Sequence, residues 1–140
     1  MRRAARYADG WLPYLYSPEQ YRESVTKISA YAREAGRDPD AIGRGLFIFT
    51  CVAGSRAEAR ATAGSRLGRL YGQDFSSMVE RYCALGTPEE CVARIRDYVD
   101  AGARHIILTP CCPARDVSAQ VQTFATRMAP HIRQLVGKDG

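Results

Sequence analysis

Apolar residues recur every three to four positions in several stretches of the chain, which is the spacing of an amphipathic helix. Three of these stretches begin with a capping box, in which a Ser or Thr is followed three residues later by Gln or Glu. The boxes are Ser17 with Gln20, Ser55 with Glu58, and Thr87 with Glu90. The pattern predicts a helix that ends near residue 8, followed by helices over residues 18–35, 56–70, 75–82, 88–101 and 117–136. Pro130 lies inside the last of these and predicts a kink there.

Two further apolar runs, residues 45–53 and 105–109, are rich in β-branched and aromatic residues and too short for typical helices. Neither alternates between apolar and polar positions, so each is predicted as a strand buried on both faces. Residues 10–16, with Trp11 and Leu12 at their centre, form an ambiguous third strand. Because strands alternate with helices, we expect about three parallel strands joined by right-handed crossovers.

The chain has 140 residues, of which 46% are apolar and 25% charged, as in one ordinary globular domain. Its longest nearly apolar run, residues 46–53, is far shorter than the roughly 20 residues needed to cross a bilayer. Met1-Arg2-Arg3 resembles the start of a signal peptide, but polar residues follow where an apolar stretch should be. We therefore predict a cytoplasmic protein with no membrane partner.

Basic residues exceed acidic ones by 20 to 15. A nucleic-acid-binding protein should concentrate its cations in a stripe with interleaved aromatic residues. Here the arginines run from Arg2 to Arg133, and many stand beside Glu or Asp. Solvated helix faces are the favoured interpretation, so no nucleic-acid partner is predicted. An RNA-binding module remains an alternative based on the charge alone.

The five cysteines suit neither a zinc site nor a disulfide framework, because their number is odd and no C-x-x-C occurs. His105 and His131 are not placed to complete a metal site, so no metal is predicted. Cys51, Cys83 and Cys91 lie in apolar patterns and are interpreted as buried thiols. The adjacent Cys111 and Cys112 follow an apolar strand, and a reactive thiol there is a less favoured alternative.

Three segments carry motifs that occur together in one protein family. Ala4-Ala5-Arg6-Tyr7-Ala8-Asp9-Gly10-Trp11 is similar to the family's entry into a late strand. Ala35-Gly36-Arg37-Asp38-Pro39 resembles a segment that precedes the next strand. Gly86-Thr87-Pro88-Glu89-Glu90, Ala101-Gly102-Ala103 and His105-Ile-Ile-Leu-Thr-Pro110 resemble the closing segment. The three occur in the right order and cover nearly the whole chain, and together they resemble the luciferase-like monooxygenase family.

The resemblance implies a (β/α)8 TIM-type barrel that uses FMN or the deazaflavin coenzyme F420 for monooxygenation or hydride transfer. A complete barrel takes about 250 residues, so we expect residues 1–140 to form a single C-terminal half-barrel domain with strands six to eight. The family's phosphate-binding loop would precede the helix that ends near residue 8. The first five strands, which carry most contacts to the isoalloxazine ring in the family, would lie there too.

In a barrel the active site lies at the carboxyl ends of the strands. Those ends are predicted at residues 13–16, 50–52 and 109–112. Tyr14 and Tyr16 are the candidate cofactor-binding residues, since each could offer a ring face or a phenol to a planar heterocycle. The favoured alternative for both is packing under the following helix, and Trp11 is interpreted as core. No catalytic residue is predicted.

Two functions therefore remain open besides RNA binding. The first is a partial luciferase-like flavin- or deazaflavin-dependent oxidoreductase, truncated and inactive alone. The second is a non-catalytic half-barrel binding or structural protein. A three-stranded parallel sheet has two open edges, so in either case we expect a homodimer or larger homo-oligomer that covers them.

Overall fold

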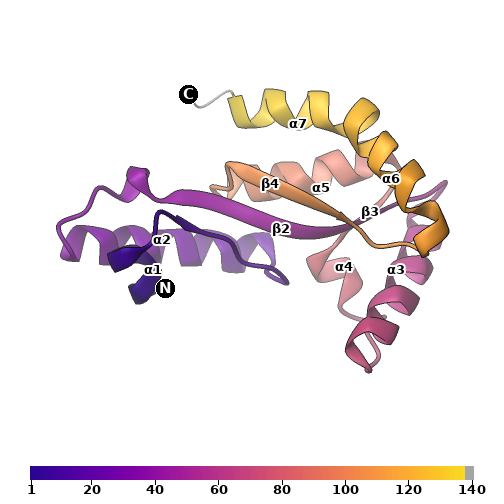
Figure 1. Ribbon diagram of the computed structural model, residues 1–140, viewed down its shortest axis with the longest axis horizontal. Coiled ribbons are helices and arrows are strands. Elements are labelled where there is room, and N and C mark those ends of the chain that lie inside the picture. Colours follow the sequence, from indigo (N-terminus) through magenta and orange to yellow (C-terminus); the bar gives the residue numbers. More distant parts are fainter. Residues whose placement is uncertain (138–140) are drawn as a thin grey trace.

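A computed structural model describes residues 1–137, which form one parallel sheet flanked by helices (Figure 1). The strands are β1 (Gly10–Trp11), β2 (Gly43–Val52), β3 (Ala84–Gly86) and β4 (His105–Pro110). β2 is central and pairs in parallel with each of the other three. Thr50 is matched with both β3 and β4, so these two lie on opposite edges of β2. β1 shares the edge of β3, because the Phe47 N–H donates to the Pro13 carbonyl while Phe47 is matched with β4 on its other side.

The helices follow the predicted order. They are α1 (Arg2–Tyr7), α2 (Pro18–Glu34), α3 (Arg56–Tyr71), α4 (Val79–Tyr82), α5 (Pro88–Asp100), α6 (Val117–Thr123) and α7 (Ala129–Val136), with short 3-10 turns at Pro39–Ala41 and Ala114–Asp116. In Figure 1, α2 lies along the first half of β2, while α3 and α6 lie near its far end. No helix within residues 1–137 is long and apolar enough to cross a membrane. The parallel α/β fold predicted from the sequence is confirmed.

Two of the three capping boxes are complete. The hydroxyl of Ser17 accepts from the Gln20 N–H while the Gln20 side chain accepts from the Ser17 N–H, and Thr87 and Glu90 do the same. The third differs: Ser55 accepts from the Glu58 N–H, but the Glu58 carboxylate accepts from the Gly54 N–H, 3.2 Å away. That carboxylate therefore stabilises the turn before α3 rather than the cap residue itself.

The last helix is interrupted where Pro130 predicted a kink. A π-helical turn over Phe124–Met128 separates α6 from α7, and α7 begins with Pro130 in its first turn. Proline has no N–H to donate to the preceding turn and clashes with it. The wider turn removes that conflict, and it keeps Phe124 and Met128 buried in the core.

The core on one face of the sheet, here called the outer face, is closed by helices. Leu46 and Ile48 of β2 pack there against α2, α5 and the last helices. Tyr21 of α2 and Tyr98 of α5 are fully buried in this cluster, with their ring centroids 6.2 Å apart. The phenol of Tyr21 donates to the carbonyl of Gly45, and that of Tyr98 to the carbonyl of Tyr16. These bonds connect the helices to β2 and to the chain that follows β1.

Three details differ from the expectations. β4 was predicted to be buried on both faces, but His105 and Ile107 are exposed because no element of the described chain covers them. The expected helix 75–82 shortens to α4, and β3 follows it. The apolar spacing predicts Ala57, Ala61 and Leu67 on the buried side of α3, whereas the structure buries Ala59 and Ala63 together with Leu67.

Candidate functional site

The other face of the sheet, here called the inner face, is built by alternate residues of three strand segments. Register partners in parallel strands point to the same side, so Phe47 lies beside Ile107 and Phe49 beside Thr109. Tyr14 lies across Phe47, with ring centroids 6.4 Å apart and the planes nearly perpendicular. Leu12, Tyr14, Phe47, Phe49 and Ile107 therefore form one continuous apolar surface.

Gly45 permits the close approach of the chain that follows β1. A Cβ atom at Gly45 would come within 2.7 Å of the Leu12 side chain and 3.3 Å of the Trp11 carbonyl. Any larger residue would push Leu12 away from β2. The glycine at this position thus helps to hold Leu12 and the following Tyr14 against the strand.

The middle of the inner face is open to solvent. Leu12 is 52% exposed, Tyr14 53% and Ile107 44%. Isolated exposed apolar side chains are ordinary, but a contiguous group marks a surface that another group covers. The inner face is therefore the main candidate for a binding or assembly surface.

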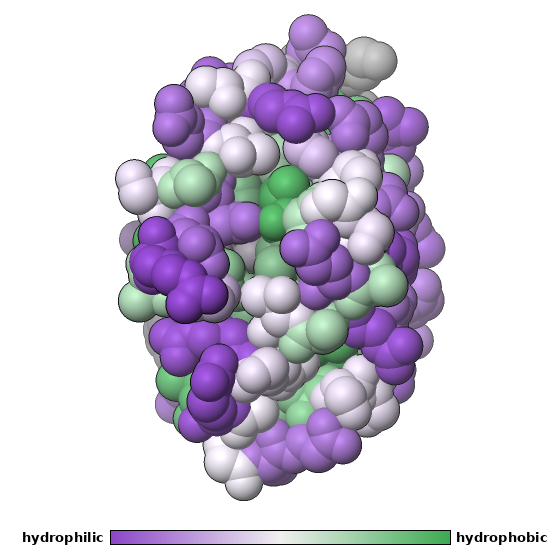
Figure 2. Space-filling model, turned by 90° about the vertical axis from the view of Figure 1, so that its right-hand side faces the viewer, coloured by the Kyte–Doolittle hydropathy of each residue, from purple (hydrophilic) through white to green (hydrophobic). Residues whose placement is uncertain are grey.

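The end of the inner face at the carboxyl termini of the strands is closed instead. Cys51 and Cys111 lie there under α3 and Phe75, and the Cys111 N–H continues the ladder by donating to the Thr50 carbonyl. Viewed from this end, the molecule shows a mainly polar surface with a narrow apolar strip in a central hollow (Figure 2). Of the strand ends predicted at residues 50–52 and 109–112, Thr50, Cys51, Cys111 and Cys112 are buried, while Val52, Thr109 and Pro110 are partly exposed.

All five cysteines are free and buried, as predicted for Cys51, Cys83 and Cys91. Burial raises the pKa of the Cys51 thiol to about 11 and that of the Cys111 thiol to about 12. Burial also raises the pKa of Cys112, with the nearby Asp116 acting in the same direction. Nucleophilic cysteines need a lowered pKa and access to solvent, so the geometry opposes a reactive thiol at Cys111 or Cys112. No cluster of His, Cys, Asp or Glu within residues 1–137 could hold a metal ion.

The two candidate tyrosines lie on different sides of the sheet. Tyr14 belongs to the exposed inner face, whereas the Tyr16 ring packs edge-on against Trp11, with centroids 5.7 Å apart. Trp11 in turn contacts Tyr21 of α2, in agreement with its interpretation as a core residue. Leu15, between the two tyrosines, has a φ of 55°, which non-glycine residues seldom adopt. The structure therefore does not bring Tyr14 and Tyr16 together.

Sequence reasoning missed Leu12, Phe47 and Ile107 as surface residues. Alternate residues of the two apolar runs, 45–53 and 105–109, point to the same face of the sheet, so every second residue belongs to the inner face. The inner-face residues could not be distinguished from the outer-face residues because both groups are apolar. Gln120 of α6 was also missed: its amide accepts from the Val52 N–H at 2.9 Å and donates to the Val52 carbonyl at 2.6 Å. It thereby closes the end of β2.

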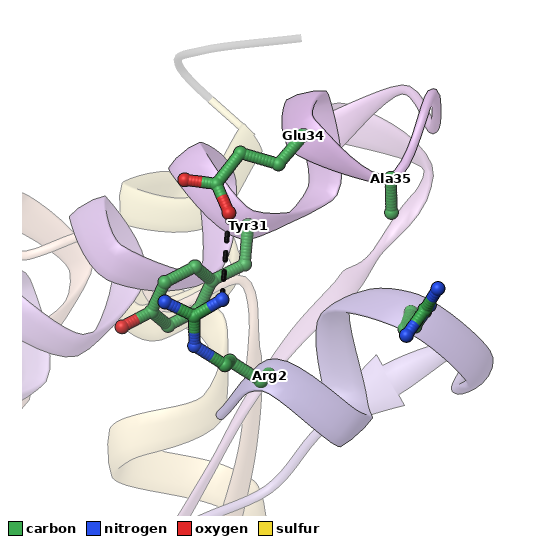
Figure 3. Close-up of a pocket in the computed structure, with 5 residues that line it drawn as sticks. Arg2, Tyr31, Glu34 and Ala35 are labelled. Atoms are coloured by element: carbon green, nitrogen blue, oxygen red, sulfur yellow. Dashed lines mark ion pairs between the residues drawn. The ribbon is translucent and has the colours of Figure 1, made fainter.

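A basic pocket of about 240 Å³ lies away from this face, between α1 and the end of α2 (Figure 3). The guanidinium of Arg2 lies 4.2 Å from the Tyr31 ring centroid and 3.6 Å from the Glu34 carboxylate. Arg37 donates to the carbonyls of Ala5 and Ala8. These contacts fasten α1 to α2, which is a structural role.

Parallel strands with most of their helices on one side, and on the other an apolar surface that α3 covers only at the carboxyl end, are typical of part of a TIM-type barrel. Comparison with known proteins agrees. Residues 1–105 match the family model for luciferase-like monooxygenases, so the chain belongs to that family.

Curated relatives include enzymes that differ in substrate. A phthiodiolone/phenolphthiodiolone dimycocerosates ketoreductase of Mycobacterium sp. (strain JLS) is 30% identical over 80 residues, which are 56% of this chain and 21% of that protein. A 5,10-methylenetetrahydromethanopterin reductase of Methanolobus tindarius is 23% identical over 74% of this chain and 43% of its own length. The chain thus spans less than half the length of these relatives.

Solved structures show the same fold. An F420-dependent secondary alcohol dehydrogenase in complex with an F420-acetone adduct superposes with a TM-score of 0.79 at 21% identity, over 94% of this chain and 45% of that one. The coenzyme F420-dependent tetrahydromethanopterin reductase from Methanopyrus kandleri gives 0.72 at 18% identity, over 94% and 47%. The match to part of a luciferase-like barrel confirms the predicted fold class.

Proposed function

We propose that this chain supplies one wall of a flavin- or deazaflavin-dependent oxidoreductase site and has no turnover alone. The single observation that carries the proposal is the exposed, aromatic inner face of a luciferase-like sheet. Relatives named for F420 support the deazaflavin class, and FMN stays the alternative that the resemblance to luciferase-like monooxygenases implies.

The residues present fit the ring system of such a cofactor. Tyr14 offers a half-exposed ring beside Phe47, and Ile107 extends the same apolar surface. Planar heterocycles pack well on apolar and aromatic side chains. When bound, the cofactor supplies hydride transfer or oxygen chemistry. The role of this chain would be to position the ring and to exclude water from one side of it.

Tyr14 is the stronger of the two candidate residues. Its ring is accessible, while the ring of Tyr16 is engaged with Trp11 and its carbonyl accepts a bond from Tyr98. Replacement of Tyr16 should therefore lower the stability of the fold as well as the affinity for any ligand. Replacement of Tyr14 should lower the affinity for the ligand alone.

The test is a titration of the purified chain with FMN and, separately, with coenzyme F420, followed by cofactor fluorescence. We expect saturable binding that Tyr14→Ala weakens five- to tenfold, as for loss of an aromatic contact of about 1 kcal/mol. Tyr7→Ala is the matched control, since Tyr7 is 74% exposed on α1. Equal effects of the two variants would contradict the role of Tyr14.

The second candidate function is a non-catalytic half-barrel protein that self-associates through the same face. The observation that favours it is the closure of the strand ends by α3, which packs over Cys51 and Cys111. Absence of saturable binding to either cofactor would favour this alternative. A cytoplasmic location is proposed for both, because five free thiols fit a reducing compartment.

A further inference from the structure

A second exposed aromatic residue besides Tyr14 lies beside the inner face. Tyr71 is the last residue of α3 and is 39% exposed. Its ring stacks on that of Phe75, with the centroids 4.9 Å apart and an angle of 23° between the planes. Phe75 itself is buried with Phe49 among the residues that close the carboxyl end of the inner face. Tyr71 therefore stands on a buried apolar base.

The stacked arrangement leaves one face of the Tyr71 ring open. Because the two rings are close to parallel, Phe75 covers one face of Tyr71. The exposed area of Tyr71 then belongs to the other face of its ring and to its edge. An open ring face on a buried aromatic base is suited to stack on a further flat ring.

The turn after α3 fixes Phe75 beneath Tyr71. Gly72 ends the helix with a φ of 67°, a left-handed conformation that suits glycine. The carboxylate of Asp74 then accepts from the Ser76 N–H at 2.8 Å, which holds the chain on either side of Phe75. A side chain that is already held in place loses less conformational freedom when a ligand binds to it.

The phenols of Tyr71 and Tyr14 lie close enough to interact. Burial raises the pKa of Tyr71, and the nearby Tyr14 and Cys111 act in the same direction. Tyr14 belongs to the segment after β1, and Cys111 directly follows β4. Tyr71 therefore lies at the boundary between the open middle of the inner face and its closed carboxyl end, and the two exposed tyrosines border the same area.

We propose that Tyr71 and Tyr14 together hold a flat aromatic ring system at this boundary, with the open face of the Tyr71 ring stacked on the ligand. This assignment rests on the proposed function, because FMN and coenzyme F420 share such a ring system. It adds the residue that determines where along the inner face the ring lies. Contacts from two aromatic side chains on separate segments favour a flat ligand over a flexible aliphatic one, since stacking requires a planar partner.

Two substitutions separate stacking on a ligand from mere shielding of Phe75. Tyr71→Leu keeps an apolar side chain over Phe75 but has no ring, whereas Tyr71→Phe keeps the ring. The matched control is Leu70→Ala, since Leu70 is the neighbouring residue of α3 and is 55% exposed. Urea unfolding of each variant verifies that it retains the fold and measures any loss of stability separately from binding.

Fluorescence titrations with FMN and, separately, with coenzyme F420 give the dissociation constants, and the titration that saturates identifies the cofactor. We expect Tyr71→Leu to raise the dissociation constant about five- to tenfold, while Tyr71→Phe and Leu70→Ala leave it within about twofold of wild type. If Tyr14→Ala weakens binding but Tyr71→Leu does not, the role of Tyr71 is overturned while the proposed function stands. If wild type binds neither cofactor, both are overturned.

Discussion

The two faces of this sheet have the same kind of side chains but different surroundings. On the outer face Leu46, Ile48 and Ile95 are buried among three helical segments. On the inner face Tyr14 and Ile107 are half exposed. The contrast shows that apolar character alone does not define the core, since the helices cover the outer face but cover the inner face only at its carboxyl end, where α3 lies.

The division separates stability from function. Burial of the outer-face residues within the chain stabilises its folded state. The exposed inner-face residues contribute such stabilisation only when a ligand or another polypeptide covers them. The outer face should therefore tolerate substitution poorly, and the inner face should tolerate it well in folding while losing binding or assembly.

The largest expected effect comes from one substitution made on each face. Ile95→Ala in α5 should lower the free energy of unfolding by about 2–5 kcal/mol, because Ile95 is fully buried and leaves a cavity. In the monomeric chain, Ile107→Ala should lower the free energy of unfolding by less than half of that amount. Urea unfolding at low protein concentration measures both, and equal losses would contradict the contrast between the faces.

A second pair of substitutions tests how the strand ends are closed. Gln120→Glu should destabilise the protein by about 1–3 kcal/mol, because a carboxylate cannot donate to the Val52 carbonyl. Gln122→Glu places the same charge at an exposed position of α6 and should change stability little. Thermal unfolding monitored by circular dichroism compares them. A similar loss of stability in both variants would indicate that the added charge on α6 is responsible, rather than the lost hydrogen bond to the Val52 carbonyl.

Alkaline pH tests the burial of the closed end. The pKa of Cys51 is raised from 9.0 to about 11 in the folded protein, so the unfolded chain releases this proton at lower pH than the native state. The stabilisation is complete below pH 9 and falls as the pH rises from 9 to 11, by up to about 3 kcal/mol. Chemical unfolding of wild type and Cys51→Ala across this range should show a shallower decline in the variant. Parallel curves would contradict the burial of this thiol.

The smallest effect is expected from a single hydroxyl. The Tyr98 phenol donates to the Tyr16 carbonyl at 2.6 Å, and Tyr98→Phe should cost about 1 kcal/mol by leaving that carbonyl without this donor. Tyr14→Phe removes a hydroxyl from the exposed face and should change stability by less than half of that. Equilibrium unfolding in urea distinguishes the two, and a larger loss for Tyr14→Phe would reverse the assignment of the faces.

Local signals explain why so much of the fold could be predicted. Capping residues such as Ser17 and Thr87 bond to backbone within three positions, so their roles depend little on the rest of the molecule. Pro130 acts through its missing N–H, which is again local. These features set the helix boundaries, and the short apolar runs between them could then only be strands.

The candidate site depends on packing between distant segments, which the sequence pattern does not contain. Burial of Cys51 and Cys111 requires α3 to fold over the strand ends. Ile107 is exposed because no element within residues 1–137 covers that side of β4. Tyr14 and Tyr16 were predicted together because they are two positions apart, but the positive φ of Leu15 breaks the regular alternation between them.

Hydrogen–deuterium exchange of the unliganded chain at low and high protein concentration tests the central claim most directly. The claim is that the inner face is open in a single copy, so that self-association, the second candidate function, would cover it together with the β1 and β4 edges. We predict that peptides spanning residues 10–16 and 105–110 gain protection with concentration, while those from α5 are protected equally at both. Exchange that does not depend on concentration in the two edge segments would contradict the claim.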